Sequence, residues 1–162
     1  MNHKIIKLGE EHLKSCIDLD KKALKGLWSK SQWERELTDD NRICLGVLEL
    51  ETNRLLAFCS AWFVIDELYI TSIAVHPKHQ RKGIGKFLLS DLIKRSNSLQ
   101  TNHIYLEVKD TNKAGKAFYK SMDFKIAAIR SNFYKDGSNA LIFTKHLKQI
   151  KKEIIKYGLP KP

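Results

Sequence analysis

The chain has 162 residues, of which 43% are hydrophobic and 29% are charged, proportions typical of one soluble domain with a single sizeable core. Its 29 lysines and arginines outnumber its 18 aspartates and glutamates, so the formal net charge is +11 and a polyanionic ligand or partner is expected. No run approaches the roughly 18 apolar residues of a membrane span, and no signal-peptide core follows the first residues, so we expect a cytoplasmic protein without membrane contact.

The first half of the chain predicts two helices between strands. The expected elements, in chain order, are a strand at 3–8, a helix near 10–25, a short helix near 30–38, and strands near 42–50 and 54–64. The polar turn at 51–54 separates the last two hydrophobic runs, which should therefore pair as a hairpin.

The second half predicts alternating strands and helices. The expected elements are a strand at 67–75, a helix at 84–97, a strand at 103–109, a helix at 112–122, and strands near 125–134 and 139–147. Asp136-Gly137 is typical of a hairpin turn between the last two strands. In the helix at 112–122, Asn112 should be the N-cap, and Tyr119 should lie off a buried stripe made by Ala114, Ala117, Phe118 and Met122.

The segment Gln80-Arg81-Lys82-Gly83-Ile84-Gly85-Lys86 joins the strand at 67–75 to the helix at 84–97. Two glycines at a helix N-terminus let the backbone approach a ligand, while unpaired N–H groups and the helix dipole favour an anion. The spacing Gln-x-x-Gly-x-Gly differs from both the dinucleotide-binding fingerprint and the P-loop. The glycines taken alone favour a strand-to-helix turn that has no ligand.

Gln80-x-x-Gly83-x-Gly85, after a strand that ends Ile73-Ala74-Val75, resembles the acetyl-CoA signature of the GNAT superfamily of N-acetyltransferases. The resemblance implies the GNAT (acyl-CoA N-acyltransferase) fold, an α/β fold whose mixed, mostly antiparallel central sheet is flanked by helices. It also implies acetyl-CoA as the acetyl donor and no metal. In this family the backbone of the strand at Ile73, Ala74 and Val75 would hold the pantetheine arm. The pyrophosphate would be held by the backbone of Arg81, Lys82, Gly83, Ile84, Gly85 and Lys86.

A second group of residues follows at 103–122. Glu107 should lie on the strand face opposite Ile104, Leu106 and Val108. Three features of this segment are together similar to the RimI-type branch of the GNAT superfamily. They are the sequence Leu-Glu-Val, an asparagine five residues after the glutamate, and a helix with the pattern Ala-x-x-x-Tyr. That branch acetylates the N-terminal alanine of a small-subunit ribosomal protein. The resemblance implies that Glu107 is the general base, Tyr119 the general acid and Asn112 a coenzyme contact.

Several other residues bear on the site and the domain limits. Gly115 shares a helix face with Tyr119, so something is expected to approach closely there. Trp28 and Tyr134 are candidates to line a peptide groove, although either could be a core residue. Asp123 stands where the family usually has glycine, and aspartate tolerates the left-handed conformation required there. The family resemblance covers 1–147, which leaves 148–162 as a basic C-terminal extension.

Three functions remain open at this stage. The resemblance favours transfer of the acetyl group of acetyl-CoA to a protein N-terminal α-amine, of a ribosomal protein, by direct attack with Glu107 and Tyr119. The alternatives are a GNAT enzyme acting on a small-molecule amine and a non-catalytic ribosome- or RNA-binding module. The basic extension could contact ribosomal RNA or simply be solvated. A covalent cysteine mechanism is not expected, because Cys16, Cys44 and Cys59 read as reduced core thiols without a nearby base.

Overall fold

The computed structural model describes residues 2–147, so the basic extension at 148–162 lies outside the described residues. The helices are α1 (Leu13–Leu24), α2 (Lys30–Thr38), α3 (Ile84–Ser98) and α4 (Lys113–Ser121), with 3-10 turns at Glu10–His12 and Pro77–His79. The strands are β1 (His3–Lys7), β2 (Arg42–Glu49), β3 (Leu55–Val64), β4 (Glu67–Val75), β5 (His103–Lys109), β6 (Lys125–Arg130) and β7 (Ala140–His146).

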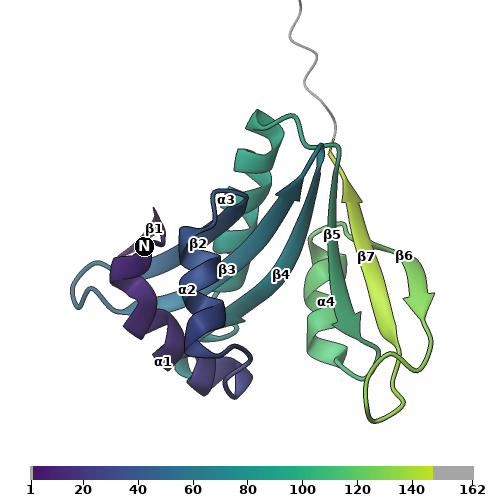
Figure 1. The fold of residues 1–162 in the computed structure, drawn as a ribbon, viewed down its shortest axis with the longest axis horizontal. Coiled ribbons are helices and arrows are strands. Elements are labelled where there is room, and N and C mark those ends of the chain that lie inside the picture. The colour runs from purple at the N-terminus through teal and green to yellow at the C-terminus, as the bar shows by residue number, and fades with distance from the viewer. Residues whose placement is uncertain (1, 148–162) are drawn as a thin grey trace, which may run out of the picture.

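Within residues 2–147, seven strands form one mixed sheet in the order β1-β2-β3-β4-β5-β7-β6. Every neighbouring pair is antiparallel except β4 and β5, which are parallel, so the expected mixed and mostly antiparallel sheet is confirmed. The hairpin of β2 and β3 is also confirmed. β4 and β5 pair only from Glu67/His103 to Ile70/Leu106, and Figure 1 shows the two strands diverging beyond that end.

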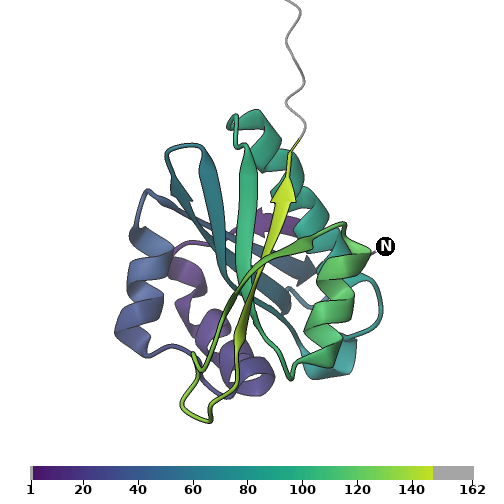
Figure 2. The same ribbon diagram turned by 90° about the vertical axis from the view of Figure 1, so that its right-hand side faces the viewer.

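Helices cover both faces of the sheet. α1 and α2 pack on one face around Leu19, Trp33 and Phe58, whereas α3 and α4 pack on the other around Leu88 and Phe143. Figure 1 shows α1 and α2 in front of the sheet and α3 behind it, and Figure 2 shows the same layers turned by 90°. The layer of α3 and α4 is the one that reaches the diverging ends of β4 and β5.

The described residues contain three free cysteines and no membrane-spanning helix. Cys16, Cys44 and Cys59 are buried and free, which confirms the expectation of reduced core thiols. No helix within 2–147 is both long enough and apolar enough to span a bilayer. The same residues contain no cluster of three or more His, Cys, Asp or Glu side chains that could hold a metal ion.

The expected buried stripe of α4 was wrong in part. Met122 is buried and Phe118 packs against the core as expected, but Ala114 and Ala117 are exposed and Tyr119 is the buried residue within the helix. An alanine fits a helical hydrophobic period but buries little apolar area, whereas a tyrosine ring buries much more. The Tyr119 ring therefore takes the inner face, with its centroid 5.7 Å from that of Phe124 and 6.1 Å from that of Phe143.

Two of the residues with left-handed backbone bear on the predicted element boundaries. Asp123, after α4, has φ +63°, so the left-handed conformation expected of it is confirmed. Asn132 has φ +51°, and β6 has already ended at Arg130. The expected strand at 125–134 was therefore too long, because left-handed backbone cannot continue a β-strand.

Candidate active site

A β-bulge in β4 marks the place where β4 and β5 separate. Thr71 is an extra residue, because consecutive residues of β3 pair with Ile70 and with Ser72. A bulge shifts the alternation of side chains, so Ile70 and Ile73 both pack on the layer of α3 and α4 although they are three residues apart. Ile70 is also the last residue of β4 that pairs with β5. From the bulge onward, one edge of β4 has no neighbouring strand.

The backbone groups along that open edge belong to alternate residues. The His76 N–H donates to the Leu56 carbonyl at 2.8 Å, and hydrogen-bonded pairs alternate along an antiparallel ladder. By this register Ala74 exchanges its backbone hydrogen bonds with β3, whereas Ile73 and Val75 direct theirs toward the open edge. Of the three residues expected to hold a pantetheine arm, Ile73 and Val75 present backbone groups there.

The loop between β4 and α3 folds back onto the end of β4. Gln80 Nε2 donates to the Val75 carbonyl at 3.1 Å, so the first residue of the motif holds the loop against the strand. Arg81 and Gly83 have left-handed φ angles of +59° and +81°, respectively. Gly85 faces Val75, since a Cβ at this position would be in ordinary contact with Val75 Cγ2, at 3.4 Å. The motif residues thus shape a tight turn against the open edge.

The N-terminus of α3 offers unpaired backbone donors. Gly83 is the N-cap and supplies no side-chain hydrogen bond, and the Phe87 N–H makes the bond to the Gly83 carbonyl at 2.9 Å. The N–H groups of residues 84–86 therefore have no acceptor one helical turn earlier. With the positive end of the helix dipole and the exposed side chains of Arg81 and Lys82, these donors suit a pyrophosphate.

A cavity of about 480 Å³ lies between this loop, the open edge of β4 and α4. It is lined by Ile73, Ala74, Val75, Gln80, Arg81, Gly83, Gly85, Lys86, Asn112, Ala114, Gly115, Phe118, Tyr119 and Ser121. Most residues expected to bind the coenzyme are in this set, but the side chains of Lys82 and Ile84 are not. Lys82 is exposed to solvent, and Ile84 is buried in the core beneath α3. Free N–H groups at one end and an open strand edge beside it fit a pyrophosphate carrying an amide-containing arm.

Tyr119 lies on the α4 side of the cavity and is 8% exposed. Its ring is edge-on to Phe118, with the centroids 5.1 Å apart. Burial raises the pKa of the Tyr119 hydroxyl well above its usual value, so the group keeps its proton at neutral pH. No residue within 2–147 makes a hydrogen bond with this hydroxyl. It is therefore able to donate a hydrogen bond to a ligand in the cavity.

Asn112 has a structural role in addition to its place in the cavity wall. Its Oδ1 accepts a hydrogen bond from the Gly115 N–H at 2.8 Å, which confirms Asn112 as the N-cap of α4. A Cβ at Gly115 would lie 2.7 Å from Asn112 Nδ2. The close approach expected at Gly115 is therefore made by the capping side chain itself.

Glu107 lies on the other face of β5 and does not line the cavity. It alternates with Leu106 and Val108, which pack in the core beside α3 and α4. Its Oε1 accepts a hydrogen bond from Arg130 Nη1 at 2.7 Å, and no residue within 2–147 donates to Oε2. The structure thus does not bring Glu107 into contact with Tyr119. The two side chains lie on opposite faces of β5, near the point where β4 and β5 separate.

The two candidate peptide-groove residues differ in their surroundings. Tyr134 is half-buried in the loop between β6 and β7, and Lys109 Nζ lies 5.3 Å from its ring centroid. Lys109 is two residues from Glu107 on β5 and shares its face, so this contact places Tyr134 on the Glu107 side of the sheet. Burial raises the pKa of Tyr134, and the negative charge of Glu107 raises it further. Trp28 instead packs edge-on against Trp33, with the centroids 4.8 Å apart. The structure groups Tyr134 with Glu107 and places Trp28 in the packing of α1 and α2.

Two contacts of the site were missed from the sequence. The hydrogen bond from Gln80 to Val75 could have been predicted locally, because a polar side chain follows the strand at a short spacing in the sequence. The hydrogen bond from Arg130 to Glu107 could not be predicted from neighbouring residues, because β7 lies between β6 and β5 in the sheet. Phe118 was expected in the core but also lines the cavity.

The chain resembles known proteins in both sequence and structure. Residues 12–124 match the sequence profile of the acetyltransferase (GNAT) family. The ribosomal protein bS18-alanine N-acetyltransferase of Haemophilus ducreyi is 28% identical over 142 residues, covering 85% of this chain and 96% of the relative. The Salmonella typhimurium protein of the same name is 39% identical over 82 residues, covering 51% of this chain and 55% of the relative. The crystal structure of the Escherichia coli ribosomal-protein-S18-alanine N-acetyltransferase superimposes with a TM-score of 0.84 at 26% identity, covering 94% of this chain and 98% of that chain.

Proposed function

The chain belongs to the acetyltransferase (GNAT) family, and on that premise we propose that it transfers the acetyl group of acetyl-CoA to the α-amine of a protein N-terminus. The names of its relatives favour a ribosomal protein as the acceptor. The observation that carries the proposal is the arrangement at the separating ends of β4 and β5. A cavity lined by most of the expected coenzyme-binding residues opens on one face of the sheet, and the Glu107 carboxylate lies on the other.

The chain's own residues can supply the proton transfers. When bound, acetyl-CoA supplies a thioester whose acyl carbon accepts the amine nitrogen as its bond to sulfur breaks. Glu107 takes the proton that the amine must lose, directly or through one water, and Oε2 is the oxygen available for it. The Ile73 and Val75 N–H groups at the open strand edge can donate to the carbonyl oxygen as it gains negative charge. The Tyr119 hydroxyl, which burial keeps protonated, donates its proton to the departing sulfur.

Two further side chains complete the acceptor side. Arg130 holds Oε1 of Glu107 and so orients the carboxylate with Oε2 free. Tyr134, on the same side, would form one wall of the groove that receives the peptide. Trp28 would act through the packing of α1 and α2 and not by touching the acceptor.

The test is acetyl transfer from acetyl-CoA to a panel of acceptors, with the products identified by mass spectrometry. The panel contains short peptides that differ in their first residue, the same peptides with a blocked N-terminus, a polyamine and an amino sugar. We expect acetylation of free N-termini and none of the blocked peptides. Turnover of the polyamine or amino sugar alone would favour a small-molecule enzyme, and tight coenzyme binding without any turnover would favour a non-catalytic module.

The Glu107→Gln variant separates chemistry from binding. Because glutamine keeps the shape of the side chain but cannot accept the proton, kcat should fall by roughly 10²-fold while the Kd for acetyl-CoA stays within about twofold. Glu51→Gln is the matched control, because Glu51 is an exposed carboxylate in the turn between β2 and β3. Wild-type turnover by the Glu107 variant at every pH would remove the general base from the proposal.

A further inference from the structure

Three aromatic side chains form a row across the sheet on the face opposite the cavity. Trp62 of β3 is paired with Tyr69 of β4, and Tyr69 is paired with Tyr105 of β5. The Tyr69 and Tyr105 rings are stacked, with centroids 5.2 Å apart and planes at 22°. Trp62 is 43% and Tyr69 is 41% exposed, and Tyr105 is half-buried. These three residues are called the aromatic row.

The aromatic row continues from the proposed acceptor site. Tyr105 and Glu107 are two residues apart on β5, so their side chains point to the same face of the sheet. With a rise of about 3.3 Å per residue and about 4.8 Å between strands, the Cα atoms of the row lie roughly 7 to 12 Å from that of Glu107. An extended peptide covers this distance in roughly two to four residues. A peptide whose amine is at Glu107 would therefore bring its third to fifth residues to the row.

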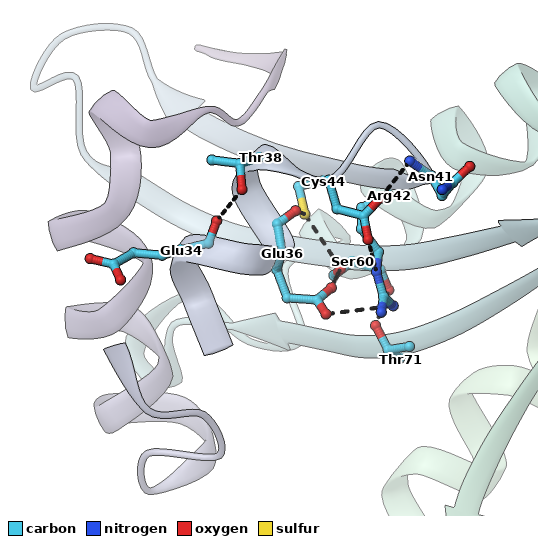
Figure 3. Close-up of polar contacts among 9 residues, drawn as sticks. Glu34, Glu36, Thr38, Asn41, Arg42, Cys44, Ser60 and Thr71 are labelled. Atoms are coloured by element: carbon cyan, nitrogen blue, oxygen red, sulfur yellow. Dashed lines mark hydrogen bonds and ion pairs between the residues drawn. The ribbon is translucent and has the colours of Figure 1, made fainter. Parts of the chain in front are cut away.

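One end of the aromatic row already holds a cation. The Arg42 guanidinium carbon lies 4.9 Å from the centroid of Trp62. Glu36 Oε1 is 3.5 Å from Arg42 Nη1, and Asp39 Oδ2 is 3.6 Å from Arg42 Nε. Figure 3 shows Arg42 beside Glu36 and Ser60, and Ser60 Oγ donates to the other Glu36 oxygen at 2.5 Å. The Trp62 end thus already holds a cation. No lysine or arginine among the described residues lies over the Tyr69 or Tyr105 ring, but the His103 ring stacks on Tyr105 with the centroids 5.8 Å apart.

Carboxylates border the Tyr69 and Tyr105 end of the aromatic row. Glu67 is two residues from Tyr69 on β4 and points to the same face, and Glu107 stands two residues from Tyr105 on β5. Glu67 is paired with His103 across β4 and β5 and is therefore the diagonal neighbour of Tyr105. Burial and the charge of Glu67 raise the pKa of Tyr105. Aromatic faces attract cations, and two carboxylates strengthen the attraction while repelling a polyanion.

We propose that Tyr69 and Tyr105 bind a lysine or arginine side chain three to five residues after the reacting amine of the acceptor polypeptide. The inference rests on the proposed function and narrows its substrate class to N-termini followed closely by a basic residue. The cation would lie against the exposed Tyr69 ring, because His103 already stacks on Tyr105, and Glu67 would be its counter-ion. Single-stranded nucleic acid also stacks on aromatic side chains, but the bordering carboxylates disfavour its phosphates.

The test compares two ten-residue peptides of identical composition, one with arginine at position 4 and one with arginine at position 9. For the wild-type enzyme, kcat/KM should be about fivefold or more higher for the position-4 peptide. Tyr69→Leu and, independently, Glu67→Gln should bring this ratio toward one, whereas Tyr69→Phe should keep most of it, because the ring is retained. Leu99→Ala, which alters another exposed apolar residue at the end of α3, should leave the ratio at the wild-type value.

The outcomes distinguish the two proposals. Equal kcat/KM for both peptides in the wild type, or a ratio unaffected by Tyr69→Leu and Glu67→Gln, would overturn the aromatic-row inference while leaving N-terminal acetylation in place. Acetylation of neither peptide would overturn the proposed function and this inference with it. Competition by a short single-stranded RNA that disappears in Tyr69→Leu would assign the row to nucleic acid and would also overturn it.

Discussion

Replacing Gly85 with valine tests whether the cavity holds the coenzyme. A Cβ at Gly85 would lie 3.4 Å from Val75 Cγ2 and 3.5 Å from Phe118 Cζ, which is ordinary contact, so alanine should fit. The two γ-carbons of valine extend about 1.5 Å further. They must either press on Val75 and Phe118 or project into the cavity where the pyrophosphate would lie. Overpacking of this kind costs about 1–3 kcal/mol.

We therefore expect Gly85→Val to weaken acetyl-CoA binding by at least about tenfold, which corresponds to about 1.4 kcal/mol. Gly85→Ala is the matched control. It should bind acetyl-CoA within about threefold of wild type and should stabilise the fold by up to about 1 kcal/mol, because alanine is the better helix former.

Calorimetric titration with acetyl-CoA gives the Kd of each variant, and scanning calorimetry reports whether each one is folded. A folded Gly85→Val protein with the wild-type Kd would refute the assignment of this cavity to the coenzyme. Equal weakening by alanine and valine would refute the steric reasoning, because the alanine Cβ meets only ordinary contacts.

Three further expectations follow from buried and capping groups. Tyr119→Phe should lower kcat by about tenfold or more. Its Tm should change little, because no described residue makes a hydrogen bond with the Tyr119 hydroxyl. An unchanged kcat in rapid-quench assays would show that Tyr119 is not the general acid. Asn112→Ala should lower the free energy of unfolding, measured by urea titration, by about 1 kcal/mol, because the hydrogen bond from the Gly115 N–H is lost. An unaltered free energy of unfolding would contradict the capping role of Asn112. Burial raises the pKa of Cys16 to about 12 and that of Cys44 to about 11, from 9.0. As the pH rises, the unfolded chain therefore loses these thiol protons before the folded chain does. The free energy of unfolding should be at its full value below pH 9 and should fall as the pH rises from 9 toward 12. Cys16→Ala should reduce the slope of this fall.

The sequence by itself determined the features that depend on short-range chemistry. The strand ending at Val75, the glycine turn and the start of α3 at Ile84 were all predictable, because backbone conformation and unpaired helix donors are set within a few residues. The Asn112 cap and the left-handed Asp123 were predictable for the same reason. Together these residues indicate an anion cradle beside an open strand.

Only the tertiary structure decided how distant segments meet. Tyr119 is buried, contrary to the predicted stripe, because the sheet offered a site for a large ring beside Phe143. Arg130 reaches Glu107 only because β7 inserts between β5 and β6. The stacking of Tyr69 on Tyr105 depends on the parallel register of β4 and β5, which are separated in sequence by the whole of α3. Such contacts follow from strand order and register, which depend on packing summed over the whole sheet and not on the residues adjacent in the chain.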